Sequence, residues 1–175
     1  MLRSVGVVVA LVASLVGLTS ATSSATPGYC GIAWGSLAKS VSPTGVGEMV
    51  GLRAGRHDCY DRLVFDVHGP IDGYWVSYVD AVTEDPTGNP VPLRGGARLS
   101  VTVQAPSHNA SGVPTYSYSN PAELVNVAGY QTFRQVAWAG SFEGSTTVGL
   151  GVRARLPFRV FTLPGRVVID VAHFW

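Results

Sequence analysis

The chain has 175 residues, of which 46% are hydrophobic and 13% are charged, so it is long enough for one folded domain with a buried core. Its 12 Lys and Arg residues nearly balance 11 Asp and Glu residues, and loss of Arg3 with the N-terminal segment leaves a formally neutral chain. No basic stripe runs along the sequence, so we expect no nucleic-acid partner.

The first residues have the organisation of a secretory signal peptide. Arg3 provides a positive start, an apolar run extends from Val5 to Leu18, and small Ser, Thr and Ala residues follow. We predict a signal peptide over residues 1–25, cleaved between Ala21 and Ala25, with Ala25 favoured. The run is shorter than the roughly 20 residues of a spanning helix, so we expect a secreted, extracytoplasmic protein with no stable membrane span after cleavage. Retention of the segment as an anchor is the alternative.

The chain has two cysteines, Cys30 and Cys59. Thiols of exported proteins usually pair in the oxidising compartment, so we predict a disulfide between them. It would tether an extended N-terminal arm, residues 26–45, to the body, and closing a loop of about 29 residues stabilises by roughly 3–4 kcal/mol. A metal-binding or catalytic cysteine is the alternative, but neither cysteine has a second ligand at metal spacing. We therefore expect neither a metal nor a cofactor.

After residue 26 the chain shows no sustained helical period, and only Pro121–Val127 is compatible with one helical turn. Short β-rich runs alternate with Gly, Pro, Asp and Asn, which predicts an all-β, single-domain antiparallel β-sandwich over residues 46–175. The expected strands are residues 49–54, 62–68, 74–82, 97–105, 131–141, 146–153, 158–163 and 166–172.

Pro164-Gly165 favours a type II turn, which fits a two-residue hairpin poorly. The last two strands are therefore expected either to be joined by a wider turn or to lie in opposite sheets.

One strand pattern occurs twice. Arg62-Leu-Val-Phe-Asp-Val67 is repeated about a hundred residues later as Arg166-Val-Val-Ile-Asp-Val171. Such a repeat predicts two equivalent strands in one architecture. Because Arg and Asp fall on one face of each strand, we expect Arg–Asp pairs across neighbouring strands, formed by Arg62, Asp66, Arg166 and Asp170. Their role is interpreted as structural.

Catalytic patterns are weak. The sequence contains four histidines but no Gly-x-Ser-x-Gly motif, which would hold the nucleophilic serine of a hydrolase. The only local cluster of metal-ligand types is His57-Asp58 with Asp61, and we expect it to face water in a turn. A small hydrolase using Asp66, Glu143 or Asp170 remains an alternative, but we predict that the protein is not an enzyme.

Several motifs in order resemble the AMIN-like domain of secreted actinobacterial proteins. They are Gly55-Arg-His57, Tyr60-Asp-Arg-Leu-Val-Phe-Asp-Val67, Ser77-Tyr-Val-Asp80, Gly140-Ser-Phe-Glu-Gly144, Pro157-Phe-Arg-Val160 and Arg166-Val-Val-Ile-Asp-Val-Ala-His173. The resemblance covers Val46 to Trp175. It implies a β-sandwich related to AMIN domains, which bind peptidoglycan on cell-wall amidases and secretins. The residues that recur in the family are here Arg62, Asp66, Phe142, Glu143, Gly144, Arg159, Asp170 and His173.

We therefore expect a non-catalytic module that is associated with the cell envelope and binds peptidoglycan or another cell-wall glycan through a sheet face. Exposed aromatic rings and planar Arg donors suit such a ligand, so the candidate binding residues are Trp75, Arg134, Glu143 and Arg159. Trp75 is expected to point outward, because its strand neighbours Tyr74, Val76 and Tyr78 form a core face. The alternative partner is an envelope protein, bound through the long polar loop Pro106–Asn120.

Overall fold

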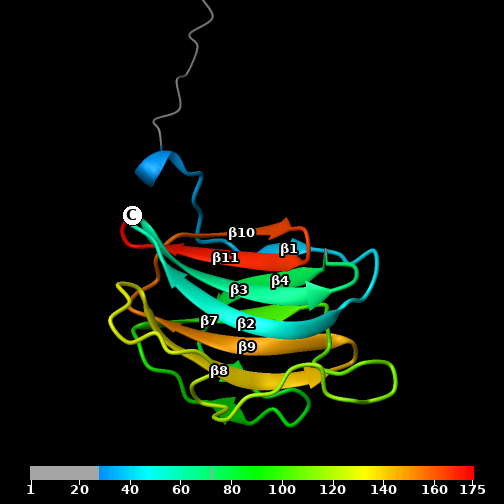
Figure 1. Ribbon diagram of the computed structural model, residues 1–175. Coiled ribbons are helices and arrows are strands. Elements are labelled where there is room, and N and C mark those ends of the chain that lie inside the picture. The colour runs from blue at the N-terminus through cyan, green and yellow to red at the C-terminus, as the bar shows by residue number, and fades with distance from the viewer. Residues whose placement is uncertain (1–27, 72) are drawn as a thin grey trace, which may run out of the picture.

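The computed structural model describes residues 28–71 and 73–175. Two antiparallel sheets pack face to face as a sandwich (Figure 1), which confirms the expected fold class. The predicted signal peptide lies outside the described residues.

The four-stranded sheet has the order β10-β11-β3-β2, and the five-stranded sheet has the order β1-β4-β7-β9-β8. A separate hairpin, β5-β6, lies outside both sheets. The strands are β1 (Lys39–Val41), β2 (Glu48–Arg56), β3 (Tyr60–His68), β4 (Tyr74–Val79), β5 (Val82–Thr83), β6 (Pro90–Val91), β7 (Ala97–Val103), β8 (Phe133–Phe142), β9 (Ser145–Val152), β10 (Phe158–Leu163) and β11 (Arg166–Ala172).

The core lies between the sheets and is built by alternation along the strands. On β3 the side chains of Leu63, Phe65 and Val67 point inward, and those of Arg62 and Asp66 point outward. The same alternation on β7, β9 and β11 adds Leu99, Val101, Val103, Val148, Leu150, Val152, Val167, Ile169 and Val171 to one continuous cluster. Each fully buried aliphatic or aromatic side chain contributes roughly 1.5–3 kcal/mol, so this cluster is the main source of stability.

The repeated strands are direct neighbours. β3 and β11 pair antiparallel, with Asp170 opposite Arg62 and Arg166 opposite Asp66. The antiparallel pairing of the two repeats therefore places an Arg opposite an Asp at two positions on the outer face of the four-stranded sheet.

Two segments close the open sides of the sandwich. On one side, the arm pairs with β10 through a bridge between Gly35 and Phe158, and then enters the five-stranded sheet as β1. The predicted disulfide between Cys30 and Cys59 is formed and fixes the start of this arm to the residue before β3. The arm is thus part of both sheets.

On the other side, the long connection between β7 and β8 covers the edge of β8. The backbone N–H of Leu124 donates to Val136 O at 2.8 Å, and the N–H of Trp138 donates to Pro121 O at 2.7 Å. These backbone groups therefore hydrogen-bond to the sheet edge, and no helix forms over residues 121–127. The helical turn with which this segment was compatible is therefore absent, and the edge of β8 is covered and protected from pairing with other chains.

The last hairpin also differs from expectation. Leu163 pairs directly with Arg166, so Pro164-Gly165 is a two-residue turn within one sheet. Gly165 adopts a φ of 70°, and its carbonyl oxygen accepts a 2.9 Å hydrogen bond from Val67 N–H. Glycine tolerates this backbone conformation, and the contact with β3 anchors the turn.

Candidate functional site

Trp75 lies on the outer face of the five-stranded sheet with 55% of its surface exposed. Its predicted outward orientation is confirmed, because Val76 points into the core while Trp75 alternates away from it. In register with Trp75 lie Thr102 on β7 and Thr147 on β9, whose hydroxyl groups are 3.0 Å apart. Ser77 and Ser100 form the next outward row. We call the surface formed by Trp75, Ser77, Ser100, Thr102 and Thr147 the tryptophan face.

The tryptophan face is hollowed on both sides of Thr102. One hollow, of about 440 Å³, lies between this face, the β5–β6 hairpin and the β8–β9 turn, and two carboxylates, Asp85 and Glu143, line it. A second hollow, of about 260 Å³, lies beside Trp75 and reaches the arm at Ser40 and Pro43. Both hollows are lined by Thr102, so the hydroxyl groups of this face lie between the Trp75 ring in one hollow and the two carboxylates in the other.

Glu143 occupies a strained position in the turn between β8 and β9. It and Gly144 have φ values of 48° and 80°, the backbone that a two-residue type I′ turn requires. A residue with a Cβ pays about 1 kcal/mol for this conformation, which Gly or Asn adopts more readily. Gln104 Nε2 donates to Gly144 O at 2.9 Å and fixes the turn to the end of β7. The turn thus holds the Glu143 carboxylate over the hollow at a cost in stability.

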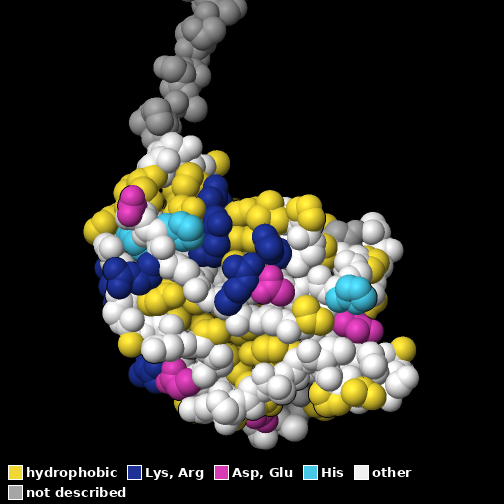
Figure 2. All heavy atoms as spheres, viewed as in Figure 1, with side chains coloured by type: hydrophobic (Ala, Val, Ile, Leu, Met, Phe, Trp, Pro, Cys, Tyr) yellow, Lys and Arg dark blue, Asp and Glu magenta, His cyan; other side chains and the backbone are white. Residues whose placement is uncertain are grey.

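Arg159 lies on the opposite side of the molecule, on the outer face of the four-stranded sheet. Six charged residues cluster there, apart from Glu48 at the start of β2, and we call them the arginine face: Arg53, Arg62, Asp66, Arg159, Arg166 and Asp170. Figure 2 shows dark-blue basic side chains gathered over this sheet, with hydrophobic side chains between them.

Each aspartate of the arginine face contacts two guanidinium groups. Asp170 is fully buried and accepts from Arg62 Nε at 2.6 Å and from Arg159 Nε at 2.8 Å. Asp66 accepts from Arg53 Nε at 2.8 Å and contacts Arg166 Nε at 3.4 Å. The hydrogen bond from Arg53, followed by the charges of Arg53 and Arg166, holds the pKa of Asp66 below its usual range. The predicted cross-strand Arg–Asp pairs are therefore present.

The Asp170 half of the arginine face is packed with aromatic rings. The Arg159 guanidinium lies over the rings of Trp34, Tyr60 and Phe161, at 5.5, 5.3 and 5.0 Å from their centroids. Trp34 comes from the arm, so this cluster attaches the arm to the sheet. Arg159 thus combines an ion pair with three ring contacts, which is the environment of a structural side chain.

The guanidinium of Arg134, on β8, also makes its hydrogen bonds within the protein. Its guanidinium donates to the carbonyl oxygens of Tyr130, Phe133 and Gln131 at 3.1, 2.8 and 3.2 Å. It lines a hollow of about 600 Å³ together with the exposed ion pair of Arg94 and Glu123. The structure therefore places Trp75 and Glu143 on one surface, and Arg134 and Arg159 on two others.

Sequence reasoning missed a buried polar network at the end of the chain. Asp61, expected to face water, is fully buried, and its Oδ1 lies 3.1 Å from His173 Nε2. Its Oδ2 accepts from the backbone N–H groups of Thr132 at 2.5 Å and Phe133 at 2.9 Å. Asp61 was wrongly predicted to face water because the residues that bury it come from distant parts of the chain. The only signal was an Asp among the inward positions of a strong strand.

Alternative sites receive less support. Asp66 and Asp170, two of the three carboxylates considered for a hydrolase, are each occupied by two arginines. Over residues 28–71 and 73–175, no three His, Cys, Asp or Glu side chains converge as metal ligands. Within the same ranges, no helix has the length and apolarity to cross a bilayer.

The loop considered for protein binding, Pro106–Asn120, packs against the sandwich. Thr115 donates its hydroxyl to Met49 O at 2.7 Å, and Tyr116 and Tyr118 pack against the Trp138 ring at centroid distances of 6.2 and 4.9 Å. Tyr118 and Val113 remain exposed on the outside of the loop.

Comparison with known proteins gives one finding. The model of the AMIN-like domain family matches residues 47–173, from the start of β2 to the last buried residue after β11. No curated protein and no solved structure matches the chain. The match extends over both sheets of the sandwich and most of the sequence, and it indicates a binding module associated with the cell wall. The chain therefore belongs to the AMIN-like domain family.

Proposed function

We propose that the protein is a non-catalytic, extracytoplasmic module that binds the glycan strands of peptidoglycan on its tryptophan face. The observation that carries the proposal is the exposed Trp75 ring beside hydroxyl groups that also line a hollow with two carboxylates. An aromatic ring packs against the apolar face of a sugar, and hydroxyl and carboxylate oxygens hydrogen-bond its rim. Family membership supports a cell-wall polymer as the ligand.

Within this proposal each residue has a distinct role. Trp75 supplies the stacking surface, and Ser77, Ser100 and Thr102 supply neutral donors and acceptors along the strands. Glu143 accepts hydrogen bonds from sugar hydroxyl or amide groups, which explains why the turn keeps a side chain where Gly would be less strained. Neutral and acidic groups dominate the larger hollow, since no basic residue lines it.

The test is co-sedimentation of the protein with purified peptidoglycan. Trp75→Ala should weaken retention about tenfold, which corresponds to about 1.4 kcal/mol of lost binding free energy. Glu143→Gln should weaken it by a smaller factor, because the amide still offers one acceptor oxygen. The matched control is Trp175→Ala, which removes an equally large ring that is 75% exposed at the other end of the molecule. Equal retention of the wild type and Trp75→Ala would reject the tryptophan face as the site.

A further inference from the structure

The two outer faces of the sandwich differ in their charged groups, although the chain without its predicted signal peptide is formally neutral. The arginine face holds four arginines and two aspartates, an excess of two positive charges. The larger hollow of the tryptophan face is lined by Asp85 and Glu143 without a basic residue. This separation arises from folding, because the four arginines come from β2, β3, β10 and β11. It gives the arginine face a partner preference that is distinct from that of the tryptophan face.

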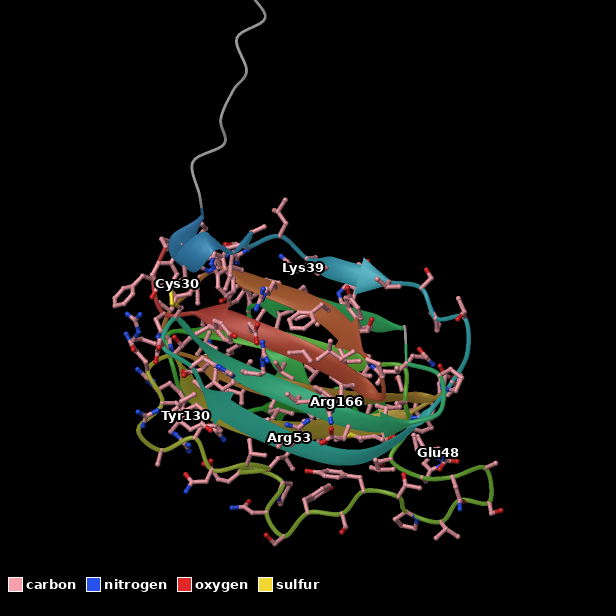
Figure 3. All side chains as sticks on the ribbon, turned by 45° about the horizontal axis from the view of Figure 1, so that its top comes forward. Cys30, Lys39, Glu48, Arg53, Tyr130 and Arg166 are labelled. Atoms are coloured by element: carbon pink, nitrogen blue, oxygen red, sulfur yellow. A yellow bond between two sulfur atoms is a disulfide. The ribbon has the colours of Figure 1, made fainter. Side chains whose placement is uncertain are left out.

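The Asp66 half of the arginine face is accessible. The side chains of Arg53 and Arg166 are 52% and 50% exposed, and Asp66 between them is 30% exposed. In Figure 3 Arg53 on β2 and Arg166 on β11 extend toward each other over β3. Arg53 uses Nε and Nη2 to hold Asp66, and a guanidinium has five N–H groups, so its outer edge remains available to a ligand.

The arginine face also shows which acceptor its geometry suits. Arg53 contacts both oxygens of the Asp66 carboxylate, at 2.8 and 3.0 Å, and Arg62 contacts both oxygens of Asp170, at 2.6 and 2.9 Å. This is the fork pairing of a planar guanidinium with a planar carboxylate. A second carboxylate can bind the remaining edges of Arg53 and Arg166 in the same manner, drawn by the positive charge that one Asp leaves uncompensated.

The spacing of the two clusters favours a polymer over a small anion. Along β11, Arg166 and Asp170 are four residues apart, which is about 13 Å in an extended strand. Between them Val64 and Val168 are buried, and the accessible apolar surface is formed by Phe161 and Leu163 on β10, which lie beside Val168 and Arg166. A single small anion reaches one cluster, whereas an extended chain contacts the arginines and covers Phe161 and Leu163.

We propose that the arginine face is a second binding surface, which takes a linear polymer bearing carboxylate groups through Arg53 and Arg166. Phe161 and Leu163 on β10 pack against the uncharged part of the chain. The surface lies on the opposite side of the sandwich from Trp75, so this site does not depend on glycan binding at the tryptophan face.

Polygalacturonate, a carboxylate polymer, is the probe, and dextran and polyphosphate are the comparison polymers. Binding to the full-length protein is measured by calorimetry at low salt and at 0.15 M salt. We expect polygalacturonate to bind, more weakly at the higher salt, and neutral dextran not to bind at this face. No binding of polygalacturonate, or equally tight binding of polyphosphate, overturns the proposal, because the second result shows attraction to charge alone.

The variants separate a binding role from a structural one. Arg53→Gln with Arg166→Gln should weaken polygalacturonate binding at least fivefold. Arg53→Lys with Arg166→Lys should weaken it about as much, since lysine keeps the charge but loses the fork. Asp66→Asn should strengthen binding severalfold, because it frees both guanidinium groups from their internal partner. Full binding by the lysine variant, or weaker binding by Asp66→Asn, contradicts the proposal.

Two controls complete the experiment. Arg94→Gln removes an exposed, ion-paired arginine outside the arginine face and should leave polygalacturonate binding unchanged. Trp75→Ala should also leave it unchanged, while reducing retention on peptidoglycan. Loss of polygalacturonate binding can therefore be distinguished from loss of peptidoglycan binding. Thermal melts of each variant check that the fold is retained.

Discussion

At the residue scale, two carboxylates within residues 28–71 and 73–175 are fully buried, and their hydrogen-bond partners differ. Asp170 lies beneath two arginines of the outer face, and Asp61 lies at the inner end of β3 between backbone N–H groups and His173. His173 Nδ1 lies 3.2 Å from Asp58 O, so both ring nitrogens face acceptors. His173 thus connects the C-terminal end of the sheet to the segment beside the disulfide.

Removal of this imidazole tests the network. His173→Ala leaves one oxygen of the buried Asp61 without its side-chain partner, and an unsatisfied buried polar group costs roughly 1–3 kcal/mol. We expect the free energy of unfolding, measured by urea denaturation, to fall by that amount. The control is His68→Ala, which truncates an exposed histidine on the same strand as Asp61 and should change stability by less than about 0.5 kcal/mol. Similar values for the two variants would show that the network contributes nothing.

At the element scale, the β5–β6 hairpin determines how much of the five-stranded sheet is open. Val82 and Leu93 pack with Ala137 and Ala139 in a second small core over β8 and β9. The outward positions of β9 beneath this segment are Gly149 and Gly151, so the covering chain lies directly on the backbone. The same hairpin forms one wall of the hollow that contains Asp85. The exposed part of the sheet is therefore the β4–β7 half that carries Trp75.

A methyl group at Gly151 tests this close approach. A Cβ built there lies 2.1 Å from the carbonyl oxygen of Arg94, which belongs to backbone that must move to make room. Gly151→Ala should lower the free energy of unfolding by roughly 1–3 kcal/mol. Gly55→Ala on β2 is the control, because its Cβ meets nothing nearer than His57 Nε2 at 3.8 Å. Equal melting temperatures for both variants would contradict the close packing of the covering segment.

At the scale of the whole molecule, the sandwich is held closed by segments that are not central strands. The arm joins both sheets through Gly35 and β1, and it adds Trp34 to the cluster around Arg159. Lys39 Nζ lies 3.9 Å from the centroid of the Phe158 ring and donates to Gly35 O, so the crossing between the sheets is also fixed by side chains. The long β7–β8 connection closes the opposite side.

The disulfide should therefore stabilise the whole fold and not the arm alone. Replacement of both cysteines, Cys30→Ser with Cys59→Ser, releases a loop closed over a sequence separation of 29 residues. We expect a loss of about 3–4 kcal/mol in the free energy of unfolding. The reduced wild type should denature at the same urea concentration as the double variant. An unchanged midpoint in both cases would show that the arm is held without the disulfide.

The sequence by itself determined the fold class, most strand positions, the disulfide and the Arg–Asp pairs. These follow from local alternation of apolar and polar residues, from two thiols in a chain with a predicted signal peptide, and from a repeated six-residue pattern. The outward direction of Trp75 was also predictable, because its neighbours Val76 and Tyr78 belong to the core face.

Only the tertiary structure decided which candidate residues share a surface. It separated Arg134 and Arg159 from Trp75 and Glu143, buried Asp61 against His173, and placed four arginines on one face and the acidic hollow on the other. The physical reason is that alternation along a strand tells inward from outward, whereas the neighbours of a side chain depend on strand order. Strand order is determined by contacts between segments up to a hundred or more residues apart, such as β3 with β11, and no local pattern encodes it.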